Sequence, residues 1–190
     1  MRLSREQRLS QLLDMAWRVV REEGTDALTL PRLADAAGVA KPVVYDHFST
    51  RSGLLAALYQ DFDTRQTQVM DAAFAASAPG LGAKATAIAS AYVDCVLAQG
   101  REIPGVVAAL AGSPELAAIK RDYQLAFIEK CRALLAPFTG AKGIAQASFW
   151  AMLGAADALS HAAATDEITA RQAQDELCET IVAIVERSGR

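Results

Sequence analysis

Apolar residues recur at intervals of three and four along almost the whole chain, which is the spacing of one face of an α-helix. Ser4 and Gln7 have the spacing of a capping box, and Gly24 stands where a first helix is expected to end. Between them the apolar face is formed by Leu9, Leu12, Leu13, Ala16, Val19 and Val20. The pattern predicts a helix over about residues 4–23.

Two short helices and one long helix are predicted next. Thr29 can cap a helix that ends at Gly38, and Pro31 fits its first turn because that position needs no N–H. A second short helix is predicted over about residues 41–47, and a long one begins near Arg51. The apolar stripe of the long helix is formed by Leu55, Leu58, Phe62 and Val69.

The sequence Ala-Pro-Gly at residues 78–80 interrupts the pattern and predicts a boundary. Beyond it, helices are predicted at about 82–99, 103–111, 114–136, 143–164 and 168–187. No strand-like alternation of useful length is present. The sequence therefore predicts an all-α protein with about nine helices.

A short helix, a glycine-containing turn and a second short helix form the unit that inserts its second helix into the major groove of DNA. Gly38 supplies the positive φ that the turn needs. Val44 and Phe48 are four residues apart and are expected to face inward. The polar residues of this helix are then left to face outward, and they are Lys41, Tyr45, Asp46 and His47. This arrangement predicts a DNA-binding helix-turn-helix.

The residues of this unit resemble the N-terminal domain of the tetracycline-repressor (TetR) family. The matching features are Ala-Gly-Val at 37–39, Tyr-x-His-Phe at 45–48 and the basic residue Arg51 three positions after that Phe. The close resemblance extends from Ser4 to Leu58. It implies a helix-turn-helix DNA-binding domain over residues 1–50 and a helical ligand-binding and dimerisation domain over residues 51–190.

The resemblance also implies roles for individual residues. The DNA-binding positions are Thr29, Lys41, Pro42, Val43, Tyr45, His47 and Arg51. Lys41, Pro42 and Val43 are placed against base edges, where a lysine can donate to guanine. The others are placed on the sugar–phosphate backbone, Arg51 at a phosphate. The sequence departs from the family pattern at Ala40, Asp46 and Gly53, where a capping Ser or Thr, an uncharged residue and a Glu would fit better.

In the family, the middle helices enclose a pocket for an inducer. The residues expected to line it here are Tyr92, Cys95, Leu110, Tyr123, Phe127 and Trp150. Aromatic walls with a few polar tips suit a small, largely apolar effector. For each single residue, ordinary core packing is the alternative.

The predicted helix over 143–164 is apolar nearly all round, so it must be covered on more than one side. We expect it to pair with the last helix and with the same two helices of a second copy, as a homodimer. The expected interface residues are Gly154, Ala155, Ala158, Ala162, Leu177, Ile181 and Ile184. A purely intramolecular core is the alternative.

Composition narrows the possible classes of protein. Hydrophobic residues make up 52% and charged residues 22% of the 190 residues, and the net charge is −3. The three cysteines form no Cys-x-x-Cys pair, which favours reduced thiols in the cytoplasm and argues against a structural zinc site. The N-terminus lacks a secretory signal, and the most apolar stretch is interrupted by polar residues. We therefore expect neither a cofactor, a metal nor a membrane partner.

The sequence and the resemblance together predict a regulator that binds a palindromic double-stranded operator as a homodimer and is released by a small effector. That the regulator represses transcription is implied by the resemblance alone. An enzyme or carrier that uses the helical pocket is a rival, but no catalytic arrangement is evident. A protein-interaction module built on the helix-turn-helix is a second rival. It would lack the steep salt dependence of binding to duplex DNA.

Overall fold

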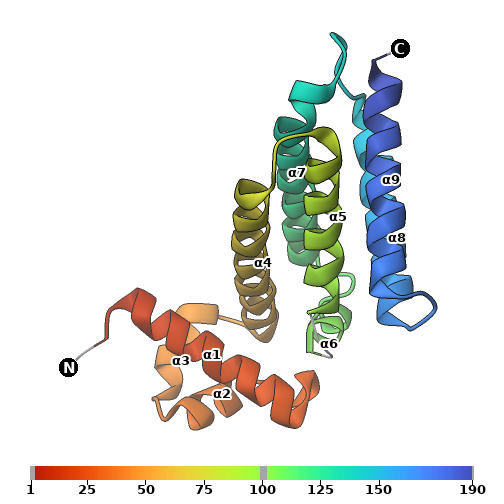
Figure 1. Cartoon of the computed structure of the whole chain (residues 1–190). Coiled ribbons are helices and arrows are strands. Elements are labelled where there is room, and N and C mark those ends of the chain that lie inside the picture. The colour runs from red at the N-terminus through yellow and green to blue at the C-terminus, as the bar shows by residue number, and fades with distance from the viewer. Residues whose placement is uncertain (1–2, 99–101, 190) are drawn as a thin grey trace. The chain divides into compact units, whose positions relative to one another are not determined.

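The computed structural model describes residues 3–98 and 102–189, and within them every regular element is a helix (Figure 1). The α-helices are α1 (Arg5–Glu23), α2 (Leu30–Ala37), α3 (Lys41–Phe48), α4 (Arg51–Ala76), α5 (Leu81–Leu97), α6 (Glu102–Ala109), α7 (Pro114–Leu135), α8 (Gln146–Ala164) and α9 (Ala170–Ser188). Two short 3₁₀ turns, η1 (Thr25–Ala27) and η2 (Ala136–Phe138), were not predicted. For the described part of the chain, the all-α class and the predicted number of long elements are confirmed.

The chain packs into two compact units that interleave along the sequence. The N-terminal unit comprises Met1–Thr64 and Gln99–Lys120, and the C-terminal unit comprises Arg65–Ala98 and Arg121–Arg190. Helices α4 and α7 therefore each contribute to both units. The domain boundary at residue 50, which the family resemblance implies, remains a proposal.

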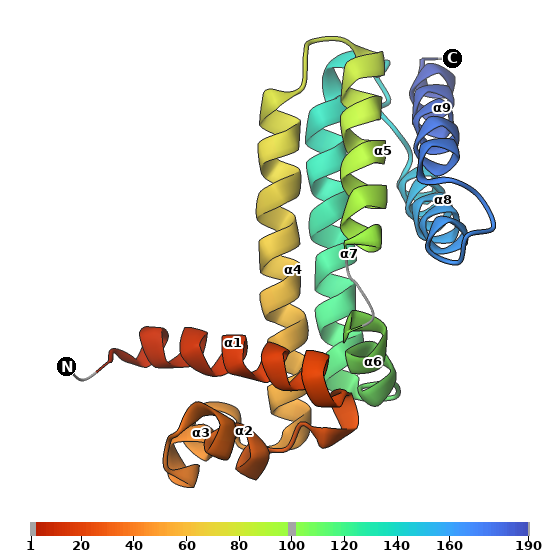
Figure 2. The same cartoon turned by 60° about the horizontal axis from the view of Figure 1, so that its bottom comes forward.

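The core of the N-terminal unit lies between α1, α2 and α3, which form the bundle at the bottom of Figure 2. The capping box of Ser4 and Gln7 starts α1 as predicted, and the apolar face of α1 is buried. Residues from much later in the chain complete this core, namely Val106, Leu110 and Leu116.

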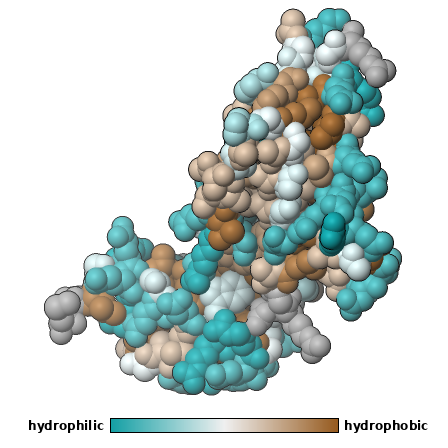
Figure 3. Space-filling model, in the orientation of Figure 1, coloured by the Kyte–Doolittle hydropathy of each residue, from teal (hydrophilic) through white to brown (hydrophobic). Residues whose placement is uncertain are grey.

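The C-terminal unit is built on α5, α8 and α9, which pack against one another, with the later halves of α4 and α7 (Figure 1). Its core is a single apolar cluster. On the face seen in Figure 3, apolar residues reach the surface of this unit, whereas hydrophilic residues predominate on the N-terminal unit. None of the described helices combines the length and apolar character needed to cross a membrane.

Candidate nucleic-acid interface and ligand groove

The turn between α2 and α3 is fixed by a cap and a glycine. Thr29 Oγ1 accepts a hydrogen bond from the Arg32 N–H at 3.2 Å, which gives α2 a side-chain N-cap. Gly38 ends α2 at φ +63° and ψ +36°, a left-handed conformation that costs glycine little. Helix α3 begins without such a cap, because Ala40 has no side-chain acceptor. The Thr29 cap and the left-handed Gly38 that the sequence predicts are therefore both present.

Helix α3 has one face in the core and one face toward solvent. Val44 is fully buried and Phe48 is 5% exposed, and both belong to the core of the N-terminal unit. Tyr45 is 46% exposed, although it is a large aromatic residue. The exposed or half-buried residues of α3 are Lys41, Pro42, Val43, Tyr45, Asp46 and His47. The structure thus brings the predicted DNA-binding residues of α3 together on an accessible surface.

His47 lies at the edge of this surface, next to charges from another helix. Partial burial lowers the pKa of its imidazole below the ordinary value, and the guanidinium groups of Arg5 and Arg8 on α1 lower it further. Asp46 opposes this shift in pKa. The ring is therefore mostly uncharged at neutral pH and offers one N–H donor.

Arg51, at the start of α4, is occupied within the protein. Its Nε donates to the Leu28 carbonyl at 2.8 Å, and its Nη2 donates to the Thr25 carbonyl at 2.8 Å. The Asp26 carboxylate lies 3.8 Å from the same Nη2. These bonds tie α4 to η1 and to the residue that precedes the α2 cap. The phosphate contact implied for Arg51 stays a prediction, and sequence reasoning missed this internal role.

The structure explains why glycine replaces the expected Glu at position 53. The Gly53 N–H donates to Thr50 Oγ1 at 3.0 Å, so the first half of a capping box is present. A Cβ atom at Gly53 would lie 2.3 Å from the Phe48 carbonyl oxygen, well inside van der Waals contact. Any side chain here would therefore displace the backbone between α3 and α4.

Three of the aromatic residues predicted for the ligand pocket fill the core of the C-terminal unit or its edge. The rings of Tyr92 and Phe127 are 5.0 Å apart, and both residues are buried. The Tyr92 hydroxyl donates to the Asp157 carboxylate, and burial, followed by the charge of Asp157, raises the pKa of this phenol. Tyr123 and Phe127 line a space of about 10 Å³, which is room for roughly one water molecule. The space that Tyr123 and Phe127 line is therefore too small for an organic effector.

Two other predicted pocket residues lie elsewhere. Leu110 is 1% exposed in the core of the N-terminal unit, and its role in ligand binding stays a prediction. Its position on α6 brings it into the helix-turn-helix core despite its place in the sequence. The Trp150 ring is covered by the Arg121 guanidinium, whose carbon is 4.9 Å from the ring centroid. Neither residue lines the larger groove of this structure.

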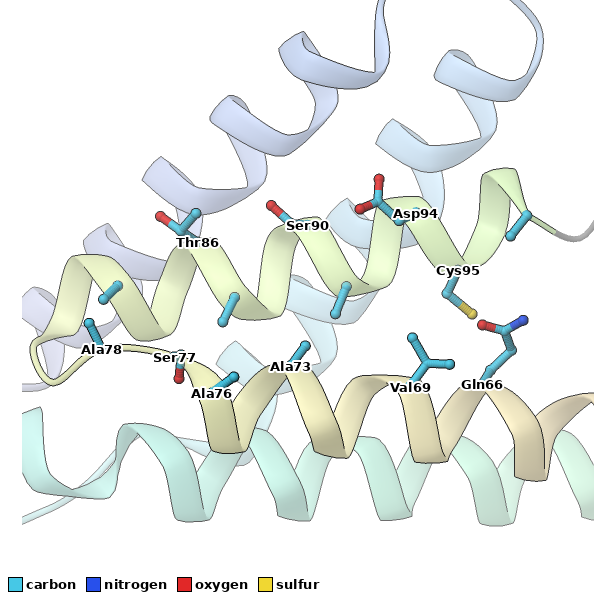
Figure 4. Close-up of a pocket in the computed structure, with 14 residues that line it drawn as sticks. Gln66, Val69, Ala73, Ala76, Ser77, Ala78, Thr86, Ser90, Asp94 and Cys95 are labelled. Atoms are coloured by element: carbon cyan, nitrogen blue, oxygen red, sulfur yellow. The ribbon is translucent and has the colours of Figure 1, made fainter.

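That groove runs between α4 and α5 within the C-terminal unit and has a volume of about 710 Å³ (Figure 4). Cys95 is the predicted ligand residue that lines it. Val69 was predicted to lie in the buried stripe of α4, but it is 61% exposed and lines the groove. The other lining residues are Gln66, Ala73, Ala76, Ser77, Ala78, Ala83, Thr86, Ala87, Ser90, Ala91, Asp94 and Ala98. Small side chains on both helices leave the space open.

The seven residues predicted for a dimer interface separate into two groups. Leu177, Ile181 and Ile184 on α9 are 0%, 0% and 4% exposed in the core of the C-terminal unit. They are covered by their own chain, and the contact with a second copy that was expected of them stays a prediction. The four predicted interface residues on α8 are exposed or half-buried, and they are Gly154, Ala155, Ala158 and Ala162. A Cβ at Gly154 would meet nothing within 4 Å, so this face is open.

Comparison with known proteins agrees with this geometry. Residues 12–58 match the family described as bacterial regulatory proteins, tetR family. The HTH-type transcriptional activator FasR of Mycolicibacterium smegmatis is 44% identical over 59 residues, which are 31% of this chain and 27% of that protein. The chain therefore matches only about a quarter of the length of this relative.

Solved structures resemble the fold along nearly the whole chain. A protein of Pseudomonas aeruginosa PAO1 described as a transcriptional regulator has a TM-score of 0.76 at 18% identity, covering 98% of this chain and 93% of its own. A TetR-family transcriptional regulator of Streptomyces coelicolor has a TM-score of 0.68 at 19% identity, covering 95% of both chains. The fatty acid degradation regulator FadR of Bacillus halodurans has a TM-score of 0.70 at 15% identity, covering 95% of this chain and 96% of its own.

The helix-turn-helix on an all-helical framework defines the class as that of transcriptional regulators. Within this class, residues 12–58 carry the helix-turn-helix segment that is typical of the tetR family of bacterial regulatory proteins. The solved structures share the fold of the chain.

Proposed function

We propose that this protein binds a palindromic DNA operator as a homodimer, represses transcription and is released by a small, largely apolar effector. The observation that carries the proposal is the outward set of residues on α3, which follows a capped α2 and a left-handed glycine. A recognition helix needs such a surface to enter the major groove.

Within this proposal, Lys41, Pro42 and Val43 meet base edges at the start of α3, where a recognition helix makes most of its base contacts. Thr29, Tyr45, His47 and Arg51 contact the backbone. Tyr45 supports this role because its exposed phenol can donate to a phosphate oxygen.

Binding to an operator found by genomic footprinting of the purified protein tests the DNA-binding role. We expect Lys41→Ala to reduce discrimination between the operator and a mismatched duplex by about 1–3 kcal/mol if the lysine reads a guanine. Tyr45→Phe should weaken all duplexes alike. Lys142→Ala is the control, because this exposed lysine lies in the C-terminal unit. Equal, sequence-blind losses in Lys41→Ala and Tyr45→Phe would reject base reading by Lys41.

The proposed homodimer rests on the open face of α8. Gly154 and Ala158 are exposed there, and small residues allow close approach of a partner helix. We expect Ala158→Glu to produce a monomer in sedimentation experiments while the helical circular dichroism is retained. Ala133→Glu, at an exposed alanine of α7, is the matched control. A monomeric wild-type protein at micromolar concentration would refute this part of the proposal.

The effector site is proposed in the groove between α4 and α5. A volume of about 710 Å³ falls within the usual range for ligand sites, and small apolar side chains form much of the lining. The effector releases DNA only if it binds the DNA-incompetent conformation more tightly. Screening for molecules that lower operator affinity, with Ala73→Phe to fill the groove, tests this step. A groove-filling variant that responds like the wild type would exclude the groove.

The sign of regulation is tested with a reporter gene behind the operator. We expect transcription to rise when the regulator is deleted, whereas a fall would indicate an activator, as the name of FasR states for that protein. The proposal includes no catalytic role. Cys131 is fully buried, and burial raises the pKa of its thiol, which disfavours the nucleophilic thiolate.

A further inference from the structure

The outward face of α3 carries little net positive charge of its own. Lys41 is the basic residue at its N-terminal end, and Asp46 on the same helix carries the opposite charge. His47 is mostly neutral at neutral pH for the reasons given above. A surface that binds the phosphate backbone generally needs several cations.

The neighbouring arginines of α2 and α4 are engaged within the protein. Arg32 Nε donates to the Glu23 carboxylate at 3.0 Å, so its charge is neutralised. Arg51 donates to the carbonyls of Thr25 and Leu28. Arg51 keeps its charge but has limited freedom to move toward a phosphate, so further positive charge from elsewhere on the N-terminal unit would strengthen binding to a duplex.

Helix α1 places two arginines beside α3. Arg5 and Arg8 are three residues apart and so lie on the same side of the first turns of α1. Both are close enough to His47 to act on its charge, and the N-terminal half of α1 lies next to α3 in Figures 1 and 2. Arg5 is exposed, and Arg8 is half-buried with its Nη1 donating to the Gln11 side chain at 2.6 Å.

The first turn of α1 is also rigid. The Ser4 hydroxyl accepts from the Gln7 N–H at 3.1 Å, and the Gln7 side chain accepts from the Ser4 N–H at 2.9 Å. This reciprocal cap holds both arginines on an ordered helix instead of a frayed terminus. Their charges are therefore presented at defined positions next to His47.

We propose that Arg5 and Arg8 extend the DNA-binding surface from α3 onto α1 and bind phosphates of duplex DNA that flank the bases facing α3. This inference rests on the proposed DNA-binding function. The two guanidinium groups supply affinity that does not depend on base sequence, because phosphates carry no base information. They also add to the positive charge of Lys41 and Arg51, whereas Arg32 is paired with Glu23.

The same helix offers a matched control. Arg18 and Arg21 lie at the opposite end of α1 and are exposed, and Arg18 pairs with Glu22 at 2.9 Å. The double variants Arg5→Gln/Arg8→Gln and Arg18→Gln/Arg21→Gln remove the same charge from the same helix. A difference in DNA binding between the two double variants therefore arises from the position of the lost charges and not from the net charge.

The test measures the affinity of the full-length protein for its operator over a range of salt concentrations. Losing two phosphate contacts should reduce the slope of log K against log[salt] by about 1.8 in Arg5→Gln/Arg8→Gln. The ratio of operator to mismatched duplex affinity should stay unchanged. Arg18→Gln/Arg21→Gln should keep the wild-type slope. Equal slopes in the two double variants would overturn the inference.

A second measurement needs no DNA. The His47 pKa, followed by NMR titration, should rise in Arg5→Gln/Arg8→Gln and stay unchanged in Arg18→Gln/Arg21→Gln, because only the first pair lies beside the imidazole. An unchanged His47 pKa in the first variant would overturn the placement of the arginines. If the wild-type protein shows no salt-dependent binding to any duplex, the proposed function itself fails. The two failures are thereby distinguished.

Discussion

The two units of this protein differ in how completely their helices close on one another. In the N-terminal unit, short helices are fixed by directional bonds, such as those from Arg51 to the carbonyls of Thr25 and Leu28. The Trp17 Nε1 likewise donates to the Asp61 carboxylate at 2.9 Å. In the C-terminal unit, long helices pack around one apolar cluster and are also joined by side-chain bonds such as that from Tyr92 to Asp157, but they leave a groove lined by small residues. A closed core specifies one geometry, whereas a groove between small side chains leaves room for adjustment.

This contrast suits the proposed function, in which one unit presents a rigid surface to DNA and the other accommodates an effector. The variants below separate the two kinds of constraint, and they are arranged from the largest expected effect to the smallest.

Leu177→Ala should destabilise the protein most, because this side chain is fully buried in the C-terminal core. Loss of a buried leucine typically costs about 2–5 kcal/mol. Urea unfolding at two protein concentrations measures the change in free energy. The loss should be the same at both concentrations, since the residue packs within one chain. A loss that grows on dilution would place Leu177 in an interface after all.

Gly53→Ala should destabilise the N-terminal unit by about 1–3 kcal/mol, because the new methyl group would press on the Phe48 carbonyl. Gly82→Ala on α5 is the matched control, since a Cβ there meets nothing within 4 Å. It should stabilise the protein by up to about 1 kcal/mol through helix propensity. Urea unfolding compares the two, and similar values would contradict the close contact at Gly53.

Arg51→Gln should cost about 1–2 kcal/mol through the lost bonds to the carbonyls of Thr25 and Leu28. Arg171→Gln is the control, because this arginine is 89% exposed and only pairs with Asp175 on the surface. Amide hydrogen exchange should show faster exchange in α2 and α3 for Arg51→Gln alone. Unchanged protection in α2 and α3 would mean that the bonds of Arg51 to the two carbonyls do not stabilise the helix-turn-helix.

His47 should give the smallest effect, a pH dependence of stability. Its pKa is lowered in the folded protein, so the unfolded chain takes up the proton first as pH falls. Above the ordinary pKa of histidine the ring is neutral in both the folded and the unfolded chain, and the protein has its full stability. Below that pKa the free energy of unfolding declines. The urea midpoint should therefore fall between about pH 7 and 5, and less so in His47→Gln. His161→Gln, at an exposed position of α8, should retain the wild-type dependence.

Much of the N-terminal unit could be predicted because its signals are local. The Thr29 cap and the Gly38 turn need only neighbouring residues, and the alternation of Val44 and Phe48 with polar residues orients α3. Arg51 was harder, because its partners lie more than 20 residues earlier and are backbone carbonyls, which leave no trace in side-chain identity.

In the C-terminal unit, periodicity located the helices but not their partners. The stripe of Leu177, Ile181 and Ile184 shows that one face of α9 is covered, and a covered face looks the same whether its neighbour belongs to the same chain or to another. Val69 matched the helical period of α4, yet it lies at the groove because the facing residues of α5 are too small to cover it.

The completion of the N-terminal core by Val106, Leu110 and Leu116 bears on how such regulators can be recombined. A chimera made by cutting after residue 50 or 64 would carry the recognition helix but leave behind the side chains that seal its core. To move the N-terminal unit onto another regulator, both segments of its core must therefore be transferred, namely residues 1–64 and residues 102–116.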